Sequence, residues 1–214
     1  MRNAMTRSAG YLCAGLLLAA AAAGPVRADA QDIGYVEKIQ NRVVAEQGGA
    51  SRQLATAKPI IFRDLLRSEA DARMQAVLLD KTQITLGENA VLQIDEFVYT
   101  PGRQGGSLAM RVTQGAFLFV GGEVEAPSGG NVTIETPVGT MGIRGTTVWG
   151  GPLDGQYGVT VLSGEVTVTN AGGSVTLQEG QGTMIRNAET APGAPAAWPE
   201  DRMDRAVKTI SFGG

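Results

Sequence analysis

Histidine is absent from the 214-residue sequence, and its only cysteine is Cys13. Serine and cysteine hydrolases use histidine as a general base, and most zinc, copper and non-haem iron sites use imidazole or thiolate ligands. We therefore predict no such catalysis, no cofactor and no metal site. Carboxylates alone can still bind calcium, but no D-x-D-x-D-G loop is present to favour it.

Carboxylates remain as candidate catalytic groups, because a glycosidase needs only two of them across a cleft. The acidic residues of one strand-rich region are Asp80, Glu88, Asp95 and Glu96. Their spacing singles out no pair, and acidic residues are usual at turns and on solvent-facing positions. We predict that the protein is not an enzyme, with a carboxylate-based glycosidase as an alternative.

Exposed aromatic side chains would indicate a glycan-binding surface, because sugar rings stack on them. The candidates are Trp149, Tyr157, Trp198, Tyr99 and Phe97. Phe117 and Phe119 alternate on one predicted strand, so their shared face is predicted to be core. We assign Trp149 and Tyr157 to a candidate interaction surface, and a glycan- or peptidoglycan-binding module is an alternative function.

The first thirty residues have the pattern of an export signal. Arg2 and Arg7 precede an apolar run from Tyr11 to Ala23, and small-residue cleavage sites follow. This run is shorter than the ~20 residues of a bilayer-spanning helix. We predict a signal peptide over residues 1–30, cleaved after Ala28 or Ala30, and a periplasmic mature protein with no membrane span. A short uncleaved anchor is the alternative.

Charge and cysteine content restrict the partners of the mature chain. Cleavage after Ala30 leaves 15 basic and 20 acidic residues, a net charge of −5. Such a surface repels nucleic acid and anionic lipid, so neither is an expected partner. Cys13 would leave with the signal peptide, so no disulfide is expected.

Short segments rich in Val, Ile, Thr, Leu and Phe alternate with Gly, Asn and Pro, as strands alternate with turns. The predicted strands are residues 83–86, 90–94, 108–112, 116–120, 132–135, 159–162, 166–169 and 175–177. Residues 62–79 contain good helix formers. They could instead form two strands, 60–66 and 73–79, with Met74, Ala76 and Leu78 on one face. We favour the two strands, because the family resemblance given below supports them.

An internal repeat indicates the architecture. Residues 131–141 align without gaps with residues 174–184, and residues 112–115 match residues 161–164. Each copy reads strand, glycine turn, strand, which indicates stacked coils sharing one core. We predict an all-β fold, a twisted β-solenoid-like or β-roll single domain over residues 31–187, with a β-sandwich as the alternative.

The C-terminal region differs in composition. Residues 188–198 are rich in Ala and Pro and are predicted to be a linker. Pro199 can open a short helix within residues 199–214, with Met203, Ala206, Val207 and Ile210 on one side. This helix can dock on the domain or recruit a partner, so Met203, Val207 and Ile210 join the candidate interaction surface.

Residues 131–147 read NVTIETPVGTMGIRGTT and resemble the hallmark of the FecR domain, in which a strand leads through T-P-V-A-T-x-G-I-R-G-T. The matching residues are Thr136, Pro137, Val138, Thr140, Gly142, Ile143, Arg144, Gly145 and Thr146. Weaker similarity at residues 33–36, 43–45, 78–99 and 115–122 extends the resemblance over roughly residues 33–186. Lys81 replaces a glycine usual in the family, so its turn either lacks a positive φ or is mildly strained.

Most of the motif has a structural explanation. Gly142 and Gly145 allow a positive φ or a close backbone approach, Ile143 points inward, and Pro137 ends a strand. Arg144 is predicted to donate to turn carbonyls or to pair with Asp95 or Glu135. Its alternative role is to bind an anionic ligand or partner.

The resemblance implies a periplasmic all-β domain found in regulators that relay outer-membrane signals to cytoplasmic sigma factors. Those regulators also carry a transmembrane helix and an anti-sigma segment, which we do not expect here. We predict a stand-alone sensing, protein-interaction or scaffold module of the cell envelope. Its expected partner is an envelope protein, which could add a strand to a sheet edge, and a glycan is the alternative ligand.

Overall fold

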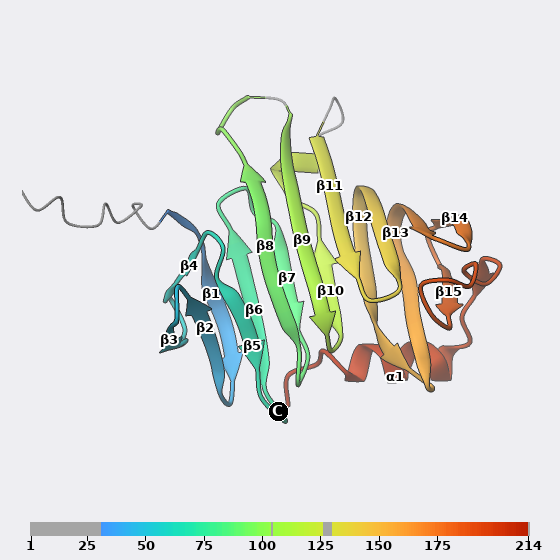
Figure 1. Ribbon diagram of the computed structural model, residues 1–214, viewed down its shortest axis with the longest axis horizontal. Coiled ribbons are helices and arrows are strands. Elements are labelled where there is room, and N and C mark those ends of the chain that lie inside the picture. The colour runs from blue at the N-terminus through green and yellow to red at the C-terminus, as the bar shows by residue number, and fades with distance from the viewer. Residues whose placement is uncertain (1–30, 104, 126–129, 214) are drawn as a thin grey trace, which may run out of the picture.

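The computed structural model describes residues 31–103, 105–125 and 130–213 (Figure 1). The predicted signal peptide, residues 1–30, lies outside the described residues. Across the described ranges the chain forms sixteen strands, one turn of 3-10 helix and one α-helix. The all-β class with a short C-terminal helix is therefore confirmed.

The elements follow one another through short connections. The first eight are β1 (Asp32–Gln40), β2 (Val43–Gln47), β3 (Ala50–Gln53), β4 (Pro59–Ile61), β5 (Leu65–Ser68), β6 (Arg73–Leu78), β7 (Gln83–Leu86) and β8 (Val91–Val98). The rest are β9 (Gly106–Gln114), β10 (Phe117–Val120), η1 (Glu123–Glu125), β11 (Gly130–Thr136), β12 (Gly139–Leu153), β13 (Gln156–Asn170), β14 (Gly173–Gln178), β15 (Gln181–Ile185), β16 (Ala196–Ala197) and α1 (Glu200–Lys208).

All the strands belong to one hydrogen-bonded sheet that curls back on itself. Its first arm is β3-β2-β5-β8-β9-β11, and its second arm is β10-β7-β6-β1-β4. β12 joins the arms, because its first half pairs with β11 and its second half with β10. β13 lies beside β12 and carries β14 and β15 on its two halves. Figure 1 shows β8 and β9 of the first arm in front of β7 and β10.

One hydrophobic core fills the space between the arms. Alternate residues of several strands point inward, including Met74, Ala76 and Leu78 on β6, as predicted. Phe117 and Phe119 of β10 are fully buried in the same core. This period-2 burial identifies residues 73–78 as a strand and rules out the helix that propensity favours. The predicted strand 60–66 is interrupted, because Phe62 and Arg63 form a turn between β4 and β5.

Two expectations about the strands are corrected. Residues 159–162 and 166–169 are parts of one bent strand, β13, and not two strands. The two repeat copies also follow different courses. β11 and β12 form a hairpin, whereas β14 and β15 pair with opposite halves of β13, so the copies are not stacked on each other. The solenoid-like course stays a prediction.

The C-terminal segment runs along the outer face of the second arm. The predicted linker contains β16, which pairs with β15, and α1 begins directly after Pro199. Figure 1 shows α1 below the strands, on the side away from β8 and β9. No helix in the described ranges has the length and apolar character needed to cross a membrane.

Candidate interaction site on strand β12

The motif residues 136–146 occupy the end of β11, a tight turn and the first half of β12. Thr136 Oγ1 donates a hydrogen bond to the carbonyl of Gly139 at 2.7 Å and accepts one from the N–H of Val138 at 3.4 Å. Pro137 lies in the turn directly after β11, as predicted. These contacts fix the point at which β12 starts.

A bend divides β12 at Gly145. Gly145 has φ 61° and neighbouring Gly164 of β13 has φ 84°. A Cβ on Gly164 would collide with the carbonyl of Gly145, so both strands turn where they touch. The pairing register shifts between Arg144 and Thr147. The bend therefore carries β12 from the first arm into the second, and the predicted positive φ of Gly145 is confirmed.

Thr146 holds the bend in place. Its side chain is buried, and Oγ1 lies 2.7 Å from the carbonyl of Arg144 and 3.0 Å from that of Glu165. Its carbonyl accepts a hydrogen bond from the N–H of Gly121 at 2.9 Å. The polar groups exposed by the irregular register are thus satisfied, as buried polar groups must be.

Glu125 of η1 completes this support. Its Oε2 accepts the N–H of Thr146 at 3.0 Å, and it packs over Gly121, where a Cβ would collide with it. Its Oε1 is buried without a hydrogen-bond partner among the described residues. Burial raises the pKa of the Glu125 carboxyl, and the negative charge of Asp80 adds to this effect.

Asp80 ties η1 to the turn between β6 and β7. The residue is fully buried, and its carboxylate accepts hydrogen bonds from Thr82 Oγ1 at 2.7 Å, Thr82 N–H at 3.1 Å and Val124 N–H at 3.3 Å. Lys81, which stands in the same turn where the family usually has glycine, has φ 69°. The turn therefore keeps the positive φ, and the backbone at Lys81 is mildly strained. Asp80 is a structural acid.

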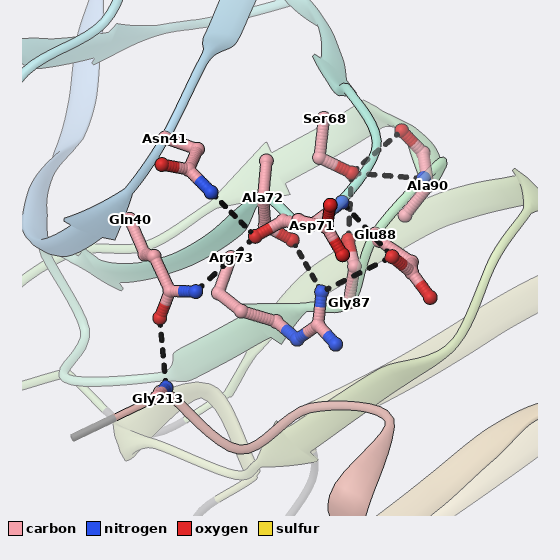
Figure 2. A network of polar contacts seen from close by, with 10 residues as sticks. All are labelled: Gln40, Asn41, Ser68, Asp71, Ala72, Arg73, Gly87, Glu88, Ala90 and Gly213. Carbon is pink, nitrogen blue, oxygen red and sulfur yellow. Dashed lines mark hydrogen bonds and ion pairs between the residues drawn. The ribbon is translucent and has the colours of Figure 1, made fainter.

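The other acidic residues considered for catalysis are also engaged in structural contacts. Glu88 accepts the N–H of Asp71 at 2.9 Å and lies 3.9 Å from Arg73 (Figure 2). Asp95 pairs with Arg111, and Glu96 accepts a hydrogen bond from Ser107. In the part of the chain that the structure describes, no cluster of acidic residues could hold a metal ion.

The first half of β12 presents alternate residues to solvent. Met141 and Ile143 are buried, whereas Thr140, Gly142 and Arg144 are exposed. Ile143 therefore points inward, as predicted. Gly142 was expected to need a positive φ or a close backbone approach, and it shows neither, because its backbone is ordinary strand and a Cβ there would meet open space.

Threonines flank the exposed residues of β12. Thr133 of β11 and Thr167 of β13 lie on either side of Gly142. We call the surface made by Thr133, Thr140, Gly142, Arg144 and Thr167 the motif face. The bare backbone at Gly142 leaves this face flat beside the guanidinium of Arg144.

Arg144 lacks the carboxylate partners expected from the sequence. Asp95 and Glu135 both pair with Arg111, at 3.3 and 2.8 Å. Glu165, opposite Arg144, accepts a hydrogen bond from Gln178 Nε2 at 2.5 Å. Within the described ranges the Arg144 guanidinium makes no ion pair or hydrogen bond. The predicted pairing of Arg144 with Asp95 or Glu135 is therefore wrong, and the predicted bonds to turn carbonyls are absent among the described residues.

The aromatic part of the predicted interaction surface is buried. Trp149 is 1% exposed, and its indole N–H donates to Thr209 Oγ1 at 3.1 Å. It packs edge-on against Trp198, with ring centroids 5.9 Å apart. Tyr157 faces the core, and burial raises the pKa of its phenol. Trp149 and Tyr157 are therefore not surface residues, because Trp149 lies under α1 and Tyr157 points between the arms.

The C-terminal helix docks on the domain. Ala206 and Ile210 are buried, and Met203 packs against the same cluster, which includes Trp149 and Trp198. Val207 is 39% exposed. Of the described residues in the predicted interaction surface, it is the one that faces solvent. Beyond the helix, the N–H of Gly213 donates to Gln40 Oε1 at 2.8 Å (Figure 2).

Two crystal structures of a candidate anti-sigma factor from Parabacteroides distasonis ATCC 8503 resemble this fold. Their TM-scores are 0.52 and 0.51, at 14% and 15% sequence identity. Each match covers 65% of this chain and 62% of the other, so this protein spans less than two thirds of the length of those structures. At this identity the likeness concerns the fold alone.

No curated protein matches the sequence. The family described as FecR protein matches residues 64–167. This range runs from the start of β5 into the second half of β13, and it includes the whole motif, the bend at Gly145 and η1. The chain therefore carries a FecR domain over residues 64–167.

Proposed function

We propose that the protein is a periplasmic, non-enzymatic module of the cell envelope that senses or scaffolds by binding a protein partner through the motif face. The FecR domain supports an envelope signalling role. The predicted signal peptide supports export, and the mature chain contains no cysteine or histidine whose chemistry would indicate an enzyme.

The observation that carries this proposal is the uncommitted guanidinium of Arg144. Arg111, one strand away from the motif, is held between Asp95 and Glu135. Arg144 has no such partner among the described residues and lies beside the bare backbone of Gly142. Arginine is enriched at protein interfaces, where its planar guanidinium makes several hydrogen bonds at once.

The alternative functions have less support. A glycan-binding module would stack sugars on exposed aromatic rings, but three of the five candidates, Trp149, Tyr157 and Trp198, are buried. The other two, Phe97 and Tyr99, are half-buried and pack against the core. A glycosidase would need two free carboxylates, and Asp80, a member of the candidate set, is sequestered by hydrogen bonds. We therefore favour a protein partner over a saccharide.

The same proposal includes a solenoid-like course for the chain. The chain crosses between the arms from β7 to β8, from β9 to β10 and from β10 to β11, and these repeated crossings support it. A β-sandwich is the alternative description.

Affinity capture from envelope extract tests the motif face. We expect the mature protein to recover an envelope protein, and Arg144→Ala to reduce its recovery about tenfold or more, as loss of an interface arginine does. Quantitative mass spectrometry of the captured proteins is the measurement.

Arg186→Ala is the matched control, because Arg186 is also exposed and makes no ion pair in the described part of the chain. It should recover the partner at the wild-type level. Equal recovery by wild type and Arg144→Ala, or equal losses in both variants, would contradict the assignment of the motif face.

A further inference from the structure

The curled sheet ends in four terminal strands, namely β3, β4, β14 and β16. A terminal strand exposes backbone N–H and C=O groups that can pair with another chain. Proteins protect such edges with short strands, charged side chains, proline or covering groups. The four edges of this sheet differ in that protection.

The edge at β4 is closed by side chains. Pro59 has no N–H, and its carbonyl accepts a hydrogen bond from Arg52 at 3.2 Å. The N–H of Ile61 donates to Asp64 Oδ2 at 2.7 Å, and Asp64 is itself paired with Arg52. The edge at β3 has four residues, among them Arg52, and β16 has only two.

The edge at β14 has no comparable protection. Its six residues read GSVTLQ, with no charge and no proline, and it pairs with β13 alone. The hairpin closes with Asn170 opposite Gly173, so the backbone groups of Val175 and Leu177 face β13. Those of Ser174 and Thr176 therefore face the free edge, and they make no hydrogen bond within the described ranges.

The next outward N–H, that of Gln178, confirms this alternation. It donates to Oε1 of Gln181 at 2.9 Å, so a side chain already caps it. Two N–H groups and two C=O groups, on Ser174 and Thr176, are left for pairing.

We propose that β14 pairs with β14 of a second copy of this chain, antiparallel about a two-fold axis at Val175. In this register Ser174 of each copy faces Thr176 of the other. The free N–H and C=O groups of both residues are then satisfied in four backbone hydrogen bonds. Gln178 keeps its bond to Gln181, because the register does not use it.

The composition of β14 fits a second copy. The strand is uncharged, so an isologous contact opposes no like charges within it. The hydroxyls of Ser174 and Thr176 lie 2.9 and 3.1 Å from those of Thr169 and Thr167, so this row stays on the solvent face. Val175 packs partly against the core and would be covered by its counterpart.

A strand pair of this length buries less than the ~1,200 Å² of a stable complex, so the dimer forms in a concentration-dependent equilibrium. The Thr176 hydroxyl lies 3.1 Å from that of Thr167, so the dimer edge borders the motif face. The pairing uses only backbone groups of β14, so it does not rest on the proposed function.

Sedimentation equilibrium of the mature protein up to about 1 mM tests the pairing. The wild-type chain should shift from monomer to dimer as its concentration rises. Combining Ser174→Lys with Thr176→Lys places lysines opposite each other at two positions, so that variant should stay monomeric.

The matched variant combines Ser174→Glu with Thr176→Lys, which places opposite charges at the same two positions. It should dimerise at least as well as the wild type. Both residues are exposed, so the variants should keep the wild-type circular dichroism. A monomeric wild type across the range would overturn the proposal, and so would identical association of the two double variants.

Discussion

At the scale of single residues, the motif separates into two sets that alternate along one strand. Ile143, Gly145 and Thr146 build the bend and its packing, whereas Thr140, Gly142 and Arg144 form an exposed surface. The bend explains why Gly145 and Thr146 are adjacent, because Gly145 supplies the positive φ and the Thr146 hydroxyl bonds the carbonyls at the bend. The exposed set has no such structural explanation, which is why we assign it to recognition.

Glu125 lends itself to a pH test, because its carboxyl is buried beside Asp80. Its pKa in the folded protein lies above the ordinary value of 4.5, so folding favours the protonated form. Ionised Glu125 therefore lowers stability above its folded pKa. That cost disappears as the pH falls through the folded pKa toward the unfolded value.

We expect Glu125→Gln to raise the Tm by about 2–4 °C near pH 8 and to change it little near pH 4. Glutamine can still accept the N–H of Thr146 but carries no charge. Thermal unfolding followed by circular dichroism at both pH values is the measurement. Glu179→Gln, at an exposed position, is the control for the charge change. A Tm gain of the same size at both pH values would show that burial of the charge is not the cause.

Sequence reasoning at this scale succeeded where local backbone geometry decides and failed where register decides. The positive φ of Gly145 and the inward direction of Ile143 were predictable from neighbouring residues. The prediction that Arg144 pairs with Asp95 or Glu135 was wrong, because the strand register places Arg111 beside both acids. Register depends on contacts between segments that are distant in the sequence.

At the scale of elements, the alternation of apolar and polar residues predicted most strands. At β6, in a helix-prone region, the alternation was weak and the resemblance to the FecR domain decided for a strand. The alternation failed at β13, where Ser163 and Gly164 read as a turn between two short strands. In the structure Gly164 sits inside one strand and bends it beside Gly145. A glycine in a sequence indicates a turn or a bend equally well, and only the neighbouring strand decides between them.

Gly164→Ala tests whether the bend needs both glycines. A Cβ there would collide with the carbonyl of Gly145, and the positive φ adds strain. We expect the free energy of unfolding to fall by roughly 2–4 kcal/mol, measured by urea denaturation.

The matched control is Gly155→Ala in the turn between β12 and β13. Gly155 has φ 76°, but a Cβ there would meet open space. This variant carries the backbone strain without the collision, so it should cost only about 1 kcal/mol. Equal losses of stability in the two variants would mean that φ strain alone, and not the contact between the strands, determines the bend.

At the scale of the whole molecule, the C-terminal segment returns over the second arm toward the start of the fold. Leu118 of β10 and Trp149 of β12 lie in an apolar cluster under α1, separate from the core between the arms. The last contact joins Gly213 to Gln40 at the end of β1. The segment, which includes Trp198, thus covers a face that would otherwise expose Trp149.

The sequence could predict this helix but not its use. Pro199 and the spacing of Met203, Ala206, Val207 and Ile210 predicted a helix with one apolar side. α1 confirms the helix but ends at Lys208, so Ile210 lies in the turn after it. The same spacing suits docking and partner recruitment, because both bury one helix face. The apolar side is narrower than predicted, since Val207 is partly exposed while Ala206 and Ile210 are buried.

Deletion of residues 199–214 should expose Trp149 and lower stability while leaving the arms folded, because the core between the arms contains no residue of α1. In a Trp198→Phe background, we expect the Trp149 emission to shift to longer wavelength. The Tm should fall by roughly 5–10 °C, mainly through loss of the buried Ile210 contact. The β-type circular dichroism at 25 °C should persist.

Val207→Ser in the same background is the control for this deletion, because it alters the exposed side of α1 and leaves its contacts with Trp149 in place. Its Tm should stay within about 2 °C of the parent, and its emission maximum should not move. If the deletion leaves the Trp149 emission unchanged, α1 does not cover this face in solution. The helix would then be free to bind a partner, as the sequence alone also allowed.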